Sequence, residues 1–96
     1  MTNTGIMLCA IFRVPADGLA SFQDYETAVL PLLREHAGVL QRRLRTADGQ
    51  SEIHVIWFPA TANLAAYRAD PRRSALASLF DASGATVEVL SVTDVA

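Results

Sequence analysis

The segment between Val39 and Pro59 constrains the fold more than any other, because it predicts a hairpin whose register is fixed. Two strand-like runs, residues 39–46 and 52–59, flank the sequence Ala47-Asp48-Gly49-Gln50. Asp-Gly fits the positive φ angles of a two-residue turn. Pairing Ala47 with Gln50 predicts that Arg45 lies opposite Glu52, Leu44 opposite Ile53, Arg43 opposite His54, Arg42 opposite Val55 and Leu40 opposite Trp57.

Because side chains alternate along a strand, this register divides the hairpin into two faces. One face carries Leu40, Leu44, Ile53, Val55 and Trp57, with Arg42 as its only charge. The other face carries Gln41, Arg43, Arg45, Glu52 and His54, and becomes apolar at Ile56 and Phe58. We expect the first face to form the core against the helices, since charged side chains are rarely buried.

The part of the chain before the hairpin predicts a strand and a helix. Residues 6–14 are apolar on both alternating sets, which is typical of a central strand covered on both faces. Residues 21–37 then predict a helix with Ser21 and Asp24 as a capping box and Gly38 as the end signal. Pro31 lies inside this helix, so we expect a kink there.

The part after the hairpin predicts a broken helical region and a last strand over residues 86–95. Thr61 begins a short helix that buries Leu64 and Tyr67, and Asp70-Pro71 begins another that ends at Gly84. The order is therefore βαββαβ. Right-handed crossovers favour an α+β, ferredoxin-like fold with a four-stranded antiparallel sheet and the helices on one face.

The length and the hydrophobic content predict one domain that pairs with a second copy of itself. Separate cores need roughly 100–200 residues each, so residues 1–96 form a single domain. A hydrophobic content of 51% is high for this length, and the helices leave one sheet face open. We expect a homodimer that covers Ile56, Phe58, half of the first strand and the last strand.

The composition excludes several classes of function. Cys9 is the only cysteine, so no disulfide forms within the chain, and with two histidines it cannot complete a structural zinc site. All eight basic residues are arginine, which excludes a lysine Schiff base, and a net charge of -2 gives no basic surface for nucleic acid. With no membrane span or signal peptide apparent, we expect a cytoplasmic protein with no membrane partner.

A family resemblance rests on three groups of residues. They are Pro31 in the first helix, the run Glu35-His36-Ala37-Gly38-Val39-Leu40, and the run Ile56-Trp57-Phe58-Pro59 that leads to Leu64, Tyr67 and Asp70-Pro71. Together they resemble the dimeric α+β barrel superfamily. Within it the chain is most similar to proteins of domain of unknown function (DUF) 1330, and more distantly to antibiotic biosynthesis monooxygenase-like and EthD-like proteins.

This resemblance implies a pocket between helices and sheet, and two sheets that close into a barrel across a dimer. Haem-degrading relatives use a Trp on the second helix, where this chain has Tyr67 and Ala77, so the resemblance does not extend to haem degradation. Cofactor-free relatives oxidise phenolic substrates that themselves activate oxygen. The resemblance therefore implies no cofactor, and we expect no metal.

Five side chains are candidates for a site, each with a structural alternative. His54 is a weak catalytic candidate as a general base, or binds an anion together with Arg43; alternatively it is hydrogen-bonded at the dimer contact. Arg42 could hold a carboxylate, or extend to solvent from an edge strand. Trp57 and Tyr67 could stack on a planar ligand, or belong to the core.

These observations leave three functions open. The first is binding of a small organic ligand, aromatic or carboxylate, between the helices and the sheet. The second is a cofactor-independent monooxygenase or isomerase-like enzyme acting on a phenolic or polyketide-like substrate. The third is a non-catalytic dimeric interaction module. The sequence does not decide whether the protein is an enzyme.

Overall fold

A four-stranded antiparallel sheet forms one layer of the protein, with its strands in the spatial order β2-β3-β1-β4. The strands are β1 (Ile6–Arg13), β2 (Val39–Arg45), β3 (Ser51–Phe58) and β4 (Thr86–Val92). The computed structural model describes residues 5–96, so residues 1–4 of the predicted domain lie outside the described residues. As predicted, the first strand is central and the second strand is at an edge.

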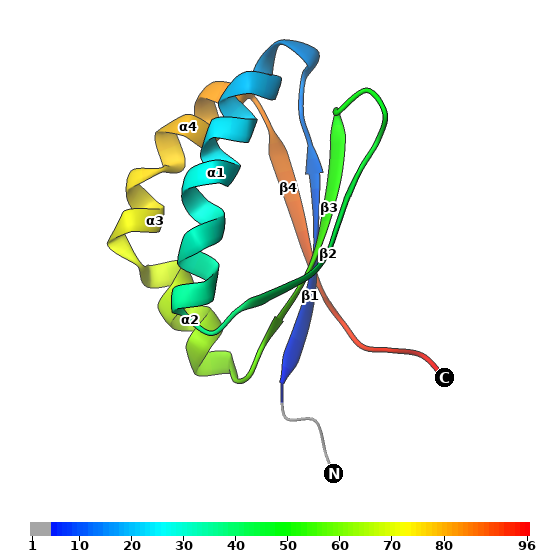
Figure 1. Ribbon diagram of the computed structural model, residues 1–96, viewed down its shortest axis with the longest axis vertical. Helices are drawn as coiled ribbons and strands as arrows, with labels where there is room; N and C mark the ends of the chain where they lie inside the picture. Colours follow the sequence, from blue (N-terminus) through cyan, green and yellow to red (C-terminus); the bar gives the residue numbers. More distant parts are fainter. Residues whose placement is uncertain (1–4) are drawn as a thin grey trace.

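The helices form a second layer on one face of this sheet (Figure 1). A short 3-10 turn, η1 (Ala16–Gly18), leads into the long helix α1 (Leu19–Glu35). After the hairpin come α2 (Thr61–Ala69), α3 (Pro71–Ala75) and α4 (Ala77–Ser83). The predicted ferredoxin-like α+β fold is confirmed. Within residues 5–96, no helix is both long and apolar enough to cross a membrane.

The helix boundaries confirm some end signals and correct others. Asp70 caps α3 through its side chain, which accepts a hydrogen bond from the backbone N–H of Arg72. Gly84 ends α4 with a φ of 71°. The Ser21 capping box is wrong, because α1 begins earlier, after Gly18, which has no side chain to cap the helix. Gly18 is needed there because a Cβ would lie 1.9 Å from the backbone oxygen of Ser83.

The hairpin keeps the predicted register near its turn and loses it further away. The four pairs from Arg45–Glu52 to Arg42–Val55 are confirmed. A bulge at Gln41 then shifts the pairing, so Leu40 lies opposite Ile56 rather than Trp57. An extra residue in one strand moves every later partner by one position, and the sequence pattern contains no signal for it.

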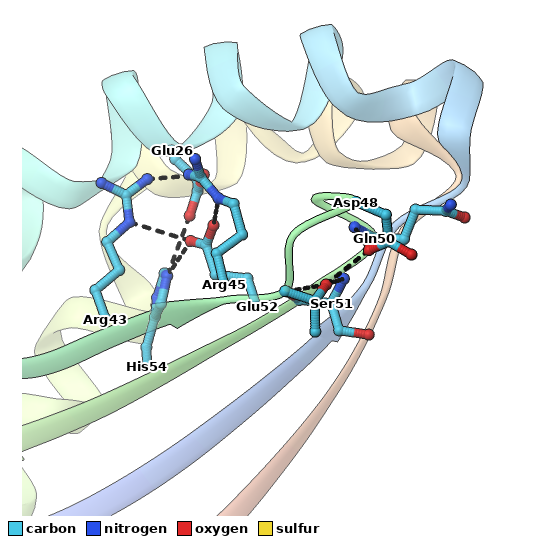
Figure 2. Close-up of polar contacts among 9 residues, drawn as sticks. Glu26, Arg43, Arg45, Asp48, Gln50, Ser51, Glu52 and His54 are labelled. Carbon is cyan, nitrogen blue, oxygen red and sulfur yellow. Dashed lines mark hydrogen bonds and ion pairs between the residues drawn. The ribbon is translucent and has the colours of Figure 1, made fainter.

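The turn is also wider than predicted. A backbone hydrogen bond between Thr46 and Ser51 closes a four-residue loop, rather than a two-residue turn between Ala47 and Gln50. Gly49 takes a positive φ of 75°, but Asp48 does not. Instead, the Asp48 carboxylate accepts hydrogen bonds from the backbone of Gln50 and the hydroxyl of Thr46 (Figure 2).

The predicted assignment of the hairpin faces is wrong. Glu52, His54, Ile56 and Phe58 face the helices, and Ile53, Val55 and Trp57 face away. Ile56 and Phe58 therefore cannot form the expected dimer contact. The prediction treated charged residues as solvent-facing, whereas Glu52 and His54 are buried at 1% and 3% exposure because they have charged partners.

Candidate functional site

A cavity of about 430 Å³ lies between the sheet and the helices. Its floor is formed by side chains of β1, β3 and β4 on the helix-facing side of the sheet: Leu8, Ala10, Phe12, His54, Ile56, Phe58, Val87 and Val89. Its roof comes from α1 and from the α2–α4 region, including Tyr25, Glu26, Tyr67, Arg73 and Phe80. Its volume is in the range of small-molecule sites in proteins.

Aromatic side chains connect the floor of the cavity to its roof. The ring of Phe12 lies 4.9 Å from that of His54 and 6.4 Å from that of Phe80, measured between centroids. Phe80 in turn lies 5.2 Å from Tyr25 in an edge-on arrangement. Flat, polarisable walls of this kind suit a planar ligand, since aromatic groups pack favourably against one another.

Three buried polar side chains meet beside this lining, to which two of them, Glu26 and His54, belong (Figure 2). Glu26 comes from the sheet-facing side of α1, and Glu52 and His54 come from one face of β3. The Nε2 atom of His54 lies 2.6 Å from a carboxylate oxygen of Glu52 and 3.1 Å from one of Glu26. We call these three residues the acid–histidine cluster.

Two arginines of the edge strand β2 neutralise the cluster from outside. Arg43 donates hydrogen bonds to both carboxylates, at 2.9 Å to Glu26 and 3.1 Å to Glu52. Arg45 donates to Glu52 at 2.6 Å and also lies within ion-pair distance of Glu26. Both guanidinium groups remain half-exposed, so they separate the buried carboxylates from solvent.

The pKa values of the two carboxyl groups, Glu26 and Glu52, are shifted in opposite directions. Burial, helped by the hydrogen bond to Glu52 and its negative charge, raises the pKa of Glu26 against the opposing effects of His54 and Arg43. Burial also acts to raise the pKa of Glu52, but hydrogen bonds from Glu26, His54, Arg45 and Arg43 outweigh it and lower the pKa to about 2. Glu52 is therefore the permanent anion, and Glu26 is the carboxyl that takes up a proton more readily.

This geometry assigns different roles to the two ring nitrogens of His54. Nε2 faces carboxylate oxygens, so it is the nitrogen that carries the ring hydrogen, and its N–H donates a hydrogen bond to Glu52. Nδ1 has no hydrogen-bond partner among residues 5–96. An imidazole anchored through one nitrogen by a carboxylate holds its other nitrogen ready to accept a proton, which is the arrangement of a general base.

The acid–histidine cluster also has the composition of a metal site, because one ligand atom from each residue lies within 4.8 Å of the others. However, the two carboxylates already face two guanidinium groups. A divalent cation would have to displace both arginines and their hydrogen bonds. The arrangement therefore fits proton transfer better than metal binding.

Of the candidates from the sequence, His54 and Tyr67 line the cavity. Arg43 contacts the acid–histidine cluster instead of lining the cavity. Arg42 and Trp57 lie on the opposite face of the sheet and do not reach the cavity. The expectation that Arg42 and Trp57 face the helices is wrong, because the helix-facing set of the hairpin is the alternate one.

Sequence reasoning missed Glu26, Glu52, Tyr25 and Arg73. A signal for Glu26 exists: it lies four residues after Phe22 and three before Val29, so it interrupts the apolar stripe of α1. A signal for Glu52 is its position two residues before His54, which places both on one strand face. Arg73 carried no comparable signal, because three short helices position it.

Similarity to solved structures supports the fold. The chain is 18% identical to Rv0793 from Mycobacterium tuberculosis, with a TM-score of 0.72 and coverage of 97% of this chain and 99% of that one. It is 17% identical to SnoaB, a cofactor-independent oxygenase from Streptomyces nogalater, with a TM-score of 0.78 over 97% and 95% of the two chains.

A nipsnap family protein with unknown function from Agrobacterium tumefaciens is 13% identical, with a TM-score of 0.67 over 96% and 91% of the two chains. Such neighbours belong to the ferredoxin-like α+β barrel superfamily, which includes antibiotic biosynthesis monooxygenase-like and NIPSNAP proteins. No protein-family profile and no curated protein matches the sequence. At these identities the shared property is the fold.

Proposed function

We propose that this protein binds a small aromatic organic molecule in the cavity between the helices and the sheet. The observation that carries the proposal is the buried imidazole of His54, which is held by Glu52 and lines a cavity of about 430 Å³. A mostly apolar pocket with a few convergent polar groups is the general form of a small-molecule site.

A ligand screen with a blocked cavity tests this proposal. Quinols, phenols and small aromatic acids are titrated against the protein, with saturable shifts of the unfolding temperature as the readout. Val89→Trp places an indole at the cavity floor, at a residue that is 45% exposed and lines the cavity, and should abolish the shifts. Val95→Trp, at 94% exposure outside the cavity, is the matched control. Equal shifts in both variants would contradict binding in this cavity.

A second candidate function is oxygenation of the bound ligand without a cofactor. The free Nδ1 of His54 favours it, and SnoaB, which shares the fold, is a cofactor-independent oxygenase. In a phenolic ligand with an activated CH₂ group, Nδ1 removes a proton and the carbanion passes electrons to O₂. One oxygen atom becomes the carbonyl oxygen and the other leaves as water, so CH₂ + O₂ gives C=O + H₂O and no external reductant is consumed.

Oxygen uptake in the presence of ligands from the screen distinguishes the functions. His54→Gln should lower the rate at least about 100-fold while ligand binding persists. Arg34→Met, on the exposed side of α1 and outside the cavity lining, is the control. An isomeric product without oxygen uptake would indicate the isomerase-like alternative, and saturable binding without any product would indicate a binding protein.

We also propose that a second copy of the chain covers the free sheet face. That face is apolar over all four strands and includes Leu44, Val55, Cys9 and Leu90.

The closer similarity to DUF1330 and EthD-like proteins stays a prediction from the sequence. So does a cytoplasmic location, which cell fractionation would check.

A further inference from the structure

Arg73 is the one buried side-chain donor without a partner in the part of the chain that the structure describes. Its Nε atom is inaccessible to solvent and has no hydrogen-bond acceptor. Its guanidinium carbon lies 4.9 Å from the centroid of the Tyr67 ring. Leaving such a donor unsatisfied costs free energy, so the position needs an explanation beyond packing.

The charge of Arg73 is also uncompensated. Glu26 and Glu52 are neutralised by Arg43 and Arg45, and no carboxylate among residues 5–96 lies within ion-pair distance of Arg73. Asp81 lines the same cavity but forms no ion pair with it. Arg73 therefore brings an unpaired positive charge into the roof of a mostly apolar cavity.

The stacking of Arg73 on Tyr67 determines which of its N–H groups can bind a ligand. A guanidinium group that packs over a ring uses its flat face for that contact, and its terminal Nη groups, unlike the enclosed Nε, stay available to a ligand in the cavity. Those terminal groups match the two oxygens of a carboxylate, or one phenolate oxygen, in geometry and charge. Tyr67 and Phe80, which also line the cavity, provide flat surfaces for the ring of the same ligand.

We propose that Arg73 recognises an anionic oxygen substituent on a planar aromatic ligand, a carboxylate or a phenolate, and so selects the ligand of this cavity. This inference rests on the proposed function. It goes further because it defines the orientation of the ligand in the cavity. The oxyanion of the ligand faces Arg73 in the roof, and another part of its ring system faces His54 on the floor. Arg73 is a specificity-determining residue in this proposal.

Two probes of equal shape test the proposal on the full chain. They are 2-naphthoate and 2-isopropenylnaphthalene, in which two carbons replace the carboxylate oxygens. Affinities are measured through naphthalene fluorescence for the wild type and for Arg73→Met, which keeps the length of the side chain and removes its charge. Arg34→Met is the matched control, because Arg34 is exposed and has no ion pair in the described residues.

The wild type should bind 2-naphthoate more tightly than the uncharged probe, by about 10- to 100-fold. Arg73→Met should remove this preference and leave the affinity for 2-isopropenylnaphthalene unchanged, while Arg34→Met keeps the preference. If both probes bind the wild type equally, or if Arg73→Met retains the preference, Arg73 does not select the ligand, although the cavity binds it. If neither probe binds the wild type, the binding function and this inference both fail.

A second measurement on the wild type covers the case in which Arg73→Met does not fold. The ¹⁵N resonances of the terminal Nη groups of Arg73 are followed by NMR as each probe is added. They should shift with 2-naphthoate in proportion to the bound fraction, and much less with 2-isopropenylnaphthalene. Nη resonances that do not change with 2-naphthoate at saturation would overturn the proposal.

Discussion

Glu52 is almost fully buried, and the fold tolerates its charge because three donors surround it. His54, Arg43 and Arg45 each hydrogen-bond to one of its two oxygens. A buried carboxylate is costly unless it is paired and hydrogen-bonded. At the scale of single residues, the site is therefore a balanced group of charges and not a single reactive side chain.

The lowered pKa of Glu52 predicts how stability depends on pH. Ionised Glu52 stabilises the fold above its ordinary pKa of 4.5, and this contribution is lost as the pH falls toward the folded-state value of about 2. Glu52→Gln should lower the free energy of unfolding by about 2–3 kcal/mol at pH 7. The difference from the wild type should shrink between pH 4.5 and 2, as measured by urea unfolding at several pH values.

The control for this experiment is Asp24→Asn, at an exposed position of α1 away from the free sheet face. Its stability should follow the wild type at every pH. A difference between Glu52→Gln and the wild type that stays constant down to pH 2 would mean that Glu52 is not the carboxylate held ionised by its neighbours.

Replacing each of two adjacent arginines of β2 should change the free energy of unfolding by very different amounts. Arg43→Met removes hydrogen bonds to both buried carboxylates and should lower the free energy of unfolding by about 1–2 kcal/mol. Arg42 points to the other face and has no ion pair among residues 5–96, so Arg42→Met should change it by less than about 0.5 kcal/mol. Thermal and urea unfolding measure both, and equal effects would contradict the assignment of the faces.

At the scale of elements, α1 ends in a hydrogen-bonded capping motif in which an alanine, Ala37, takes the position where glycine is usual. The N–H of Gly38 bonds to the carbonyl of Leu33 and that of Ala37 to Arg34, the two bonds of a Schellman motif. Ala37 takes the left-handed conformation at φ 63°, where glycine is usual. Gly38 cannot carry a side chain, because a Cβ would lie 2.5 Å from the side chain of Leu33.

The same substitution should therefore have opposite effects at two alanines. Ala37→Gly relieves a left-handed alanine and should stabilise the protein by about 0.5–1 kcal/mol. Ala66→Gly, at an exposed position inside α2, should destabilise it by about 1 kcal/mol. Chemical denaturation of the two variants measures the sign, and a loss of stability in Ala37→Gly would show that the strain is absent.

At the scale of the whole molecule, the two sheet faces have different partners. The helices cover the face with Leu8, Phe58 and the acid–histidine cluster. The other face has no helix on it within residues 5–96 (Figure 1). Its rows of apolar side chains include two cations, Arg13 on β1 and Arg42 on β2, and one anion, Glu88 on β4. Arg42 and Glu88 lie at opposite edges of the sheet. A self-complementary patch of this kind suits a two-fold contact.

The proposed dimer predicts a mass near twice 10.4 kDa in light scattering at micromolar concentration. Leu90 lies on the free face at 42% exposure, so Leu90→Arg should be tolerated by the subunit and should reduce the mass to that of a monomer, because a buried unpaired charge opposes association. Val95→Arg, beyond the last strand, should remain dimeric. A wild-type mass of one chain would contradict the dimer.

The order of the elements, the position of the hairpin and the first four pairs of its register were all predictable from the sequence. These depend on local signals: alternation, the Asp48-Gly49 turn, and the Asp70 and Gly84 end signals. The sequence also identified His54 and Tyr67 as candidates. Which face of the sheet is buried was not predictable, because it depends on Glu26, a partner 28 positions away in the chain, whose contact offsets the cost of burying His54.

The same reason explains why Arg42 and Trp57 were expected at the cavity and lie on the opposite face. Alternation defines two sets of side chains, but it does not say which set meets the helices when both contain apolar and charged residues. The choice is made by long-range pairing, in which Glu26 and two arginines compensate Glu52 and His54. The unpaired Nε of Arg73 is likewise a product of packing, because three helices bring it into a cavity whose floor lies in the sheet.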